Sequence, residues 1–279
     1  MRRKITARQL QAFERHLQAE EKSAATLEKY RRDVAAFARF AANETVDKAL
    51  TVRYKAQLAS RYAVASANSM LAAVNAFLRF MEWTDCCVRQ FNVQRNTFSS
   101  AERELTKAEY LRLINAAGQS GNRRLFLLLQ TLCATGMRVS ELPFITAEAV
   151  RRGEATVTCK NKTRTVFLVR ELQKQLLKYM RDEGIVTGCV FITKRGNPVN
   201  RCNIWREMKG LCKRAGVSPQ KVFPHNLRHL FARLFYSAEK DLVTLADILG
   251  HSSINTTRIY TASSGAEHKR RMAHLHLLL

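Results

Sequence analysis

Residues 154–169, EATVTCKNKTRTVFLV, decide the fold class of this 279-residue chain. β-Branched residues alternate with others on both sides of a short basic segment, which is typical of two strands joined by a tight turn. Elsewhere, apolar residues recur at intervals of three and four, as they do along one face of an amphipathic helix. The sequence therefore predicts a mainly α-helical protein with a small antiparallel β-sheet.

The chain that follows the predicted hairpin returns to helix after one interruption. A helix is expected at residues 171–182, and nearly everything from Cys202 onward has a helical pattern. Between these helices, residues 189–193 are expected to form a brief strand that precedes a turn at residues 194–197.

The chain that precedes the hairpin is poor in turn-forming residues. The first glycine is Gly118 and the first proline is Pro143, so the first hundred residues contain few tight turns. Four apolar stripes at helical spacing indicate four helices that pack as a bundle, with their aromatic residues in the core. The stripes are Leu10, Phe13 and Leu17; Leu27, Tyr30, Val34, Phe37 and Ala41; Tyr54, Leu58 and Tyr62; and Leu71, Val74, Phe77, Leu78 and Met81.

A polar segment at residues 92–104, NVQRNTFSSAERE, separates these helices from the rest. A capping box at Thr106 and Glu109 then opens a new helix. We therefore predict an N-terminal helical domain at residues 1–97, a linker at 98–103 and a second domain at 104–279.

The second domain is expected to begin with helices before the hairpin. A buried helix at residues 125–132 should end at Thr135 and Gly136, because glycine commonly follows the last helical residue. A further helix should begin at about Val139.

The composition points to a polyanionic partner. Lys and Arg number 47 against 23 Asp and Glu, a formal charge of +24, and both halves of the chain are basic. Because 46% of residues are hydrophobic, the chain can build a core, which excludes a disordered basic tail. The chain has no apolar run long enough to cross a membrane. A strong positive field on a folded chain favours nucleic acid as the partner.

The cysteines do not form a metal site in the sequence. There are seven, they are scattered, and no CxxC pair is present, so four-ligand zinc spacing is absent. We expect reduced thiols in a cytoplasmic protein, mostly as small core residues. No metal and no cofactor are expected.

Six of the seven histidines lie in the last 55 residues, and three of them fall within two notable motifs. PHNLRHLFA (224–232) places His225 and Arg228 three residues apart on one face of a helix. LGHSSINTTRIYT (249–261) places His251 nine residues before Tyr260, and ATGMRVSEL (134–142) contains an arginine and a glutamate at a helix start. Each motif alone also fits a solvated helix face, an ordinary ion pair or a core tyrosine.

In this order, and together with the basic hairpin CKNKTR (159–164), these motifs resemble the tyrosine recombinases, also called phage-type integrases. Residues 20–40 resemble the first helix pair of that family's core-binding domain. The resemblance implies an N-terminal four-helix, SAM-like core-binding domain and a C-terminal catalytic domain, as in the simple two-domain, Xer-like members.

The resemblance also implies a reaction. Tyr260 would attack a DNA phosphodiester, giving a 3′-phosphotyrosyl link and a free 5′-hydroxyl. Without a metal ion, fixed cations must meet the charge of the transition state. Arg138 and Arg228 match the family's two arginines, and a guanidinium presents a planar fork to two phosphate oxygens.

The remaining family roles also fall on residues of this chain. His251 matches a histidine or tryptophan that contacts the phosphate, and His225 matches the histidine that helps to take the tyrosine proton. Lys160 would protonate the leaving 5′-oxygen. Lys162 is the alternative, because this hairpin is one residue shorter than the family's usual Gly-Lys-Gly-Asn-Lys. Glu141 would support the geometry of the site.

The partners implied by the resemblance are double-stranded DNA with an inverted-repeat core site and three further copies of the chain, giving a tetramer on DNA. The tail at residues 263–279 is expected to dock on a neighbouring protomer, with packing on its own domain as the alternative. The expected location is the cytoplasm, in association with the nucleoid, and the expected task is DNA integration or resolution, for instance of a mobile element. Two alternative functions are a catalytically silent DNA-binding regulator on the same fold and a type IB topoisomerase.

Overall fold

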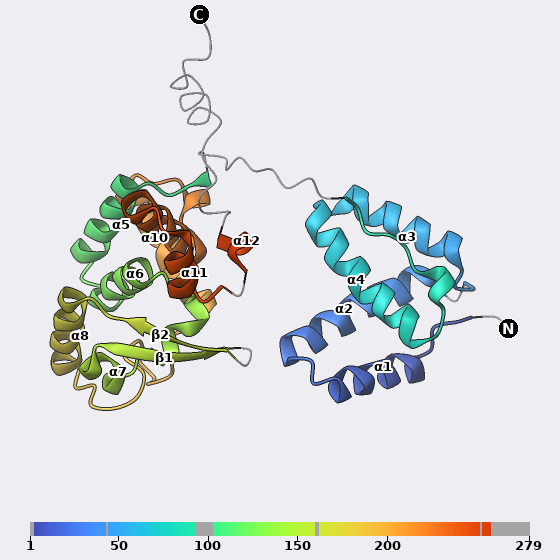
Figure 1. Ribbon diagram of the computed structural model, residues 1–279, viewed down its shortest axis with the longest axis horizontal. Helices are drawn as coiled ribbons and strands as arrows, with labels where there is room; N and C mark the ends of the chain where they lie inside the picture. Colours follow the sequence, from blue (N-terminus) through green and yellow to red (C-terminus); the bar gives the residue numbers. More distant parts are fainter. Residues whose placement is uncertain (1–2, 43, 93–102, 160–161, 252, 258–279) are drawn as a thin grey trace, which may run out of the picture. The chain divides into compact units, whose positions relative to one another are not determined.

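The computed structural model describes residues 3–42, 44–92, 103–159, 162–251 and 253–257. The chain divides into two compact units, residues 1–95 and 96–279, each described here by itself (Figure 1). Within the described ranges, no helix is both long enough and apolar enough to cross a membrane.

The first unit is a bundle of four helices, α1 (Ala7–Ala19), α2 (Ala24–Ala41), α3 (Lys48–Arg61) and α4 (Val64–Phe80), with a short 3₁₀ helix η1 (Thr84–Cys86). Side chains of Thr6, Ser23 and Asp47 cap the first three helices, which fixes where each begins. The predicted apolar stripes face inward, and Phe37, Leu71 and Phe77 lie in the core. The exception is Tyr62, which was expected in the core but follows the last residue of α3 and is 48% exposed. The four-helix prediction is therefore confirmed.

Two asparagines of α4 fix the segment that leaves this bundle. Asn75 donates to the carbonyl of Val88 at 2.8 Å and accepts from its N–H at 3.0 Å. Two helical turns earlier, Asn68 makes the same pair of bonds to Phe91 at 2.9 and 2.7 Å. The two amide groups thus act as a hydrogen-bonding edge for the extended segment that ends the unit.

The second unit is mainly helical around one hairpin. Its elements are α5 (Lys107–Gln119), α6 (Arg123–Thr135), η3 (Val139–Phe144), α7 (Ala147–Arg152), β1 (Glu154–Cys159), β2 (Lys162–Phe167), α8 (Arg170–Asp182), α9 (Arg201–Ala215), η4 (Pro219–Lys221), α10 (Pro224–Glu239), α11 (Leu242–Leu249) and α12 (Ile254–Thr257). The strands are antiparallel, from Glu154 opposite Phe167 to Cys159 opposite Lys162. The expected fold class is confirmed.

The central helix of this unit is α6, which packs against α5, α8, α9 and α10. Leucines of α6 are buried along most of its length, as its apolar sequence predicts. The helix ends at Gly136, whose left-handed φ of 61° turns the chain towards η3. The C-terminal end of α6 therefore lies next to both α10 and η3.

Two predicted elements differ from the observed ones. The helix expected near Val139 is a 3₁₀ helix of six residues that contains Pro143, whose missing N–H cannot continue an α-helix. The strand expected at residues 189–193 is wrong: this segment makes only two isolated bridges, Thr146 with Cys189 and Ile192 with Pro198. Pro198 has no N–H with which to extend the second bridge into a ladder.

Candidate active site

Arg228 lies at the centre of the candidate site. It projects from the first turns of α10 and is only 1% exposed. Its Nη1 donates to the carbonyl of Gly136 at 2.7 Å, and its Nη2 donates to the carbonyl of Leu249 at 2.8 Å and contacts His251 Nε2 at 2.8 Å. The guanidinium therefore joins the last turns of α6 and α11, two helices that end in glycine.

Both of these glycines are required by close packing. A Cβ on Gly136 would lie 2.4 Å from Cδ1 of Phe231, and one on Gly250 would lie 2.4 Å from Cδ of Arg164. Both residues also have a left-handed backbone, with φ of 61° and 66°. Glycine lets the helix ends approach the site without a side chain in the way.

Glu141 is the buried anion of the site, with a side chain only 2% exposed. Its Oε1 accepts from Nη1 of Arg138 at 3.0 Å, and its Oε2 accepts from the backbone N–H of Arg138 at 2.8 Å and from Nη2 of Arg164 at 2.6 Å. Arg138 precedes the first residue of η3, so Glu141 faces it one turn later. The side chain of Arg138 is 40% exposed, which leaves its guanidinium accessible to a ligand.

His251 follows Gly250 and is held at both ring nitrogens. A guanidinium carries only donors, so Nε2 must accept from Arg228 and the ring proton must lie on Nδ1. Nδ1 then donates to Oγ1 of the buried Thr257 at 2.9 Å. The pKa of His251 is lowered to about 4, first because burial removes water from the ring and then because Arg228, Arg138 and Arg164 repel a further positive charge. The imidazole is therefore neutral at neutral pH.

His225 lies at the surface near the two site arginines. Loss of solvent, followed by the charges of Arg228 and Arg138, holds its pKa below the ordinary value. One turn later, His229 packs edge-on against it, with ring centroids 4.6 Å apart. The pKa of His229 is lowered to about 4, mainly because of burial and then because of His225. At neutral pH His225 is thus an uncharged imidazole that can accept a proton.

The structure therefore brings together five of the predicted residues: Arg138, Glu141, His225, Arg228 and His251. Lys160 and Tyr260 lie outside the described residues. Lys162 closes the ladder of β2 opposite Cys159.

The sequence analysis missed Arg164. It was visible as the last residue of the basic hairpin motif, but nothing in the sequence indicates that it contacts Glu141.

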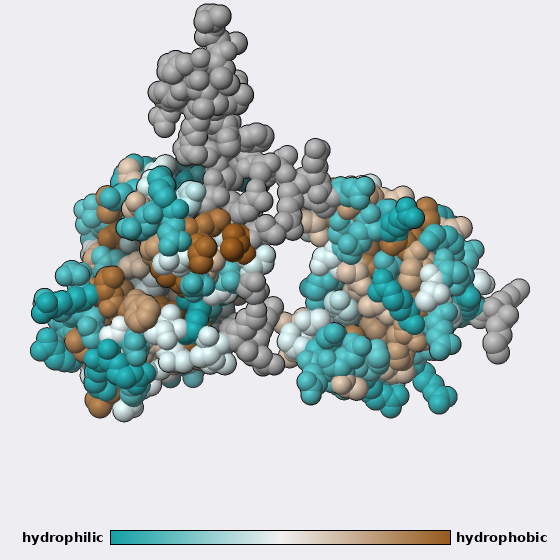
Figure 2. Space-filling view, viewed as in Figure 1, coloured by the Kyte–Doolittle hydropathy of each residue, from teal (hydrophilic) through white to brown (hydrophobic). Residues whose placement is uncertain are grey.

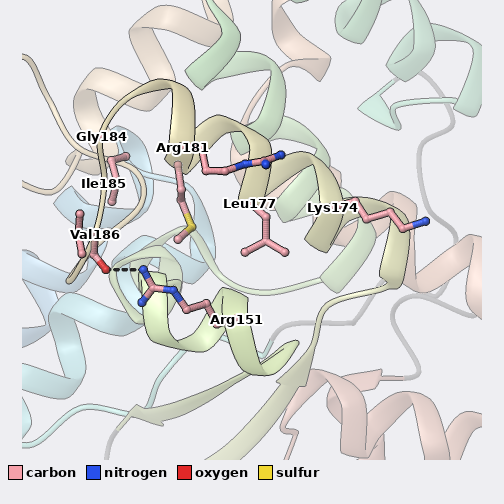
Figure 3. A pocket seen from close by; sticks show the side chains of 8 residues that line it. Arg151, Lys174, Leu177, Arg181, Gly184, Ile185 and Val186 are labelled. Atoms are coloured by element: carbon pink, nitrogen blue, oxygen red, sulfur yellow. Dashed lines mark hydrogen bonds between the residues drawn. The ribbon is translucent and has the colours of Figure 1, made fainter.

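A cavity lies away from these residues, between α7 and the end of α8 (Figure 3). It measures about 640 Å³, and basic residues surround an apolar floor formed by Leu177, Met180 and Ile185. Arg151 donates to the carbonyl of Val186 at its edge, at 2.7 Å. None of the predicted site residues lines it. Within the described part of the chain, no group of histidine, cysteine and acidic side chains could hold a metal ion.

The visible surface is mainly hydrophilic on both units, and hydrophobic residues gather near α11 and α12 in the second (Figure 2). The exposed hydrophobic residues of the last helices include Leu234, Val243 and Ile254, which are 41%, 59% and 48% exposed.

Two family models match the chain. The phage integrase family matches residues 103–267, and the N-terminal SAM-like domain of phage integrases matches residues 10–85. The first match covers more than half of the chain and includes every residue of the candidate site.

Curated relatives match across both units. The chain is 28% identical to tyrosine recombinase XerA of Pyrococcus furiosus over 278 residues, which covers 96% of this chain and 94% of that one. It is 30% identical to tyrosine recombinase XerC of Pelobacter propionicus, with 91% and 90% covered. A match to tyrosine recombinase XerH of Campylobacter jejuni is 35% identical but covers only 53% of this chain and 43% of the relative.

Solved structures have the same fold. A crystal structure of XerA recombinase matches with a TM-score of 0.54 at 26% identity, with 99% of this chain and all of that chain covered. XerH bound to its difH substrate matches with a TM-score of 0.71 at 17% identity, with 96% and 84% covered. A lambda integrase tetramer bound to a Holliday junction matches with a TM-score of 0.72 at 20% identity, with 90% and 76% covered.

Proposed function

The chain belongs to the phage integrase family of tyrosine recombinases, and we propose that it cuts and rejoins DNA strands at a specific site through a 3′-phosphotyrosyl intermediate. The observation that carries this proposal is the convergence of Arg138, Arg228 and His251 from three distant segments. Such a cluster of donors suits a phosphate whose oxygens gain charge in the transition state.

The first step is phosphate binding. Arg228 is held by two backbone carbonyls, so its position is fixed before DNA arrives. Arg138 is held by Glu141 and remains 40% exposed, so it can turn its other donors to a phosphate oxygen. Because these cations need not be reorganised during the reaction, they stabilise the developing charge effectively.

His251 changes its role when the phosphate binds. Its neutral ring accepts from Arg228 through Nε2, so it has no proton there to give. A bound phosphate adds negative charge, which raises the pKa of the ring. The protonated Nε2 then donates to a phosphate oxygen while Nδ1 stays on Thr257.

The second step is attack by Tyr260. The phenol has a pKa of about 10 in water, so it needs a base and nearby positive charge to react. His225 supplies the base, because loss of solvent and then the nearby arginines lower its pKa and favour the neutral imidazole, and the same cations would stabilise a phenoxide. The Tyr260 Oη–P bond forms, the P–O5′ bond breaks, and a lysine donates its proton to O5′.

Lys160 is the proposed proton donor, with Lys162 as the alternative. Lys160 falls between the last paired positions of the hairpin, Cys159 and Lys162. The covalent link conserves the energy of the phosphodiester, so the 5′-hydroxyl of another strand can reverse the step without ATP. The reaction requires no metal ion and no cofactor. Glu141 supports the geometry by pairing with Arg138.

The proposed substrate is double-stranded DNA with an inverted-repeat core site, on which four protomers assemble. Two solved structures of similar proteins support this assembly: XerH bound to its difH substrate, and a lambda integrase tetramer bound to a Holliday junction. We further propose that the tail docks on a neighbouring protomer. The exposed Leu234, Val243 and Ile254 offer an apolar surface near the C-terminal end of the described chain. The protein would act in the cytoplasm on the nucleoid, in integration or resolution, for instance of a mobile element.

The comparisons give no support to the two alternatives. The reacting residue types are all present, so a silent regulator is disfavoured, and the relatives that span both units are recombinases rather than topoisomerases.

The test uses a nicked duplex that carries the site and loses a short fragment on cleavage, which traps the covalent complex. The wild-type protein should form a denaturation-resistant adduct in the presence of EDTA, and Tyr260→Phe should form none. An equal yield from Tyr260→Phe would overturn the nucleophile assignment. A two-site strand-exchange assay then separates a recombinase from a topoisomerase, which relaxes supercoils without exchange.

A further inference from the structure

Arg164 joins three elements of the second unit. It lies on β2, opposite Val157 of β1. Its Nη2 donates to Oε2 of Glu141 at 2.6 Å, and its Nη1 donates to the carbonyl of Ile248 at 2.7 Å. One guanidinium thus connects the hairpin to η3 and to the last turn of α11.

The surroundings of Arg164 are built for this side chain. It is only 13% exposed, and Glu141 beneath it is 2% exposed. The chain leaves room for its stem by placing glycine at position 250, where a Cβ would lie 2.4 Å from Cδ of Arg164. A buried ion pair is costly to desolvate and needs good geometry and further hydrogen bonds, both of which the contacts with Ile248 and Arg138 supply.

The two acceptors of Arg164 belong to the two parts of the candidate site. Glu141 holds Arg138, and Ile248 comes three residues before His251. An arginine fork can bind both acceptors at fixed angles, whereas a lysine ammonium is a single point of charge on a flexible stem. Arg164 therefore determines where the middle of the hairpin lies relative to the phosphate-binding residues.

We propose that Arg164 is a positioning residue for strand cleavage: it anchors the hairpin so that the lysine at its turn lies beside the leaving 5′-oxygen. This rests on the proposed function, in which Lys160 donates the proton. Arg164 contacts no reacting atom. It acts through the hairpin on one side and through Glu141 on the other.

The test compares two leaving groups. One nicked duplex has the ordinary 5′-oxygen at the scissile phosphate, and the other has sulfur in its place. When Tyr260 attacks the sulfur substrate, the P–S bond breaks and a thiolate leaves, which needs no proton because thiol pKa values are near 8–9. The measured quantity is the ratio of the sulfur to the oxygen cleavage rate within one protein preparation, from which any loss of folded protein cancels.

The expected result concerns Arg164→Gln and Arg164→Lys. Both should slow cleavage of the oxygen substrate, by about 10-fold to 100-fold for the glutamine variant, because general acid catalysis contributes at least about 100-fold. Both should raise the sulfur-to-oxygen ratio by about 10-fold or more, since sulfur bypasses the misplaced lysine. Arg164→Lys keeps the charge and the stem, so it remains informative if the glutamine variant folds poorly.

The controls separate this proposal from the function on which it rests. Arg170→Gln removes an exposed arginine just after the hairpin and should leave the ratio unchanged. Lys160→Ala should raise the ratio; if neither it nor Lys162→Ala does, the lysine step of the proposed function is wrong. If a lysine variant raises the ratio and both Arg164 variants leave it at the wild-type value, the positioning role is overturned.

Discussion

Each unit of the chain buries one carboxylate beside two basic residues, but the two clusters are built differently. In the first unit Asp33, 2% exposed, accepts from Lys29 at 2.7 Å and from Arg32 at 3.2 Å, and all three lie on α2. In the second unit Glu141 pairs with Arg138 beside it and with Arg164 on a strand 23 residues away.

The difference separates a local ion pair from a long-range one. Residues of one helix are brought together by the helix itself, and the Asp33 cluster reaches one other element, α4, where Lys29 donates to the carbonyl of Ser69 at 2.9 Å. The Glu141 cluster ties a 3₁₀ helix, a hairpin and the end of α11 to one point. We infer that the Glu141 cluster holds the reacting residues in position, whereas the Asp33 cluster supports a binding surface.

The backbone shows the same contrast. In the first unit the described residues with a left-handed backbone are Glu21, Ala42 and Glu82, none of them glycine. In the second unit Lys240 and eight glycines have this backbone, and two of the glycines, Gly136 and Gly250, border the candidate site without space for a side chain. Substitutions at such positions in the second unit should therefore lower the free energy of unfolding more than those in the first unit, and should also slow the proposed reaction.

Arg228→Ala should have the largest effect. It removes a donor of the proposed transition state and unpairs the buried carbonyls of Gly136 and Leu249. We expect the rate of adduct formation on the nicked duplex to fall by at least about 100-fold, with DNA binding retained in a gel-shift assay.

The matched change in the first unit is Asp33→Asn, which removes the charge of that unit's buried carboxylate. It should leave the adduct rate per bound complex unchanged, because its partners lie on its own helix. Normal adduct formation by bound Arg228→Ala would count against a role for this residue in the transition state.

Much of this arrangement could be predicted from the sequence. Apolar spacing placed the four helices of the first unit, and alternation placed the hairpin. The motifs named Arg138, Arg228 and His251. The contact of Arg164 with Glu141 could not be predicted, because it depends on how a hairpin packs against η3. The strand expected at residues 189–193 failed because strand propensity does not supply a partner with free N–H groups.

Gly136→Ala should have the next largest effect. The new methyl group would meet the ring of Phe231, and alanine is strained at a φ of 61°. We expect the free energy of unfolding of the second unit to fall by about 2–4 kcal/mol in urea denaturation. Cleavage should slow as well, since the carbonyl of Gly136 holds Arg228.

Gly121→Ala is the matched control, because Gly121 has a φ of 71° but nothing within 4 Å of a Cβ. It should cost about 1 kcal/mol from backbone strain alone. Equal losses from the two variants would show that packing at the site adds nothing.

Two histidines of the second unit should make its stability depend on pH. The folded pKa values of His251 and His229 are about 4, below the ordinary value of 6.5. Between these values the unfolded chain binds more protons than the folded one, so the free energy of unfolding rises with pH across this window and falls as pH drops from 6.5 towards 4.

The melting temperature of His251→Gln should therefore depend less on pH than that of the wild type. A His251→Gln curve parallel to the wild-type curve would contradict the sign or the site of the effect.

Ala42→Gly should have the smallest effect and the opposite sign. Ala42 ends α2 with a φ of 42°, a conformation that costs an L-residue about 1–2 kcal/mol, and glycine removes this cost. Part of the gain is lost because glycine has more freedom in the unfolded chain, so we expect the free energy of unfolding of the first unit to rise by about 0.5–1 kcal/mol in urea denaturation.

The neighbouring Ala41→Gly is the control, because Ala41 lies within the helix and is buried, and it should instead lower the free energy of unfolding by about 1 kcal/mol. Neither change should alter the cleavage rate per bound complex, because the first unit carries backbone strain where no reaction depends on it; a loss of cleavage by Ala42→Gly would show that this strain is coupled to the site after all.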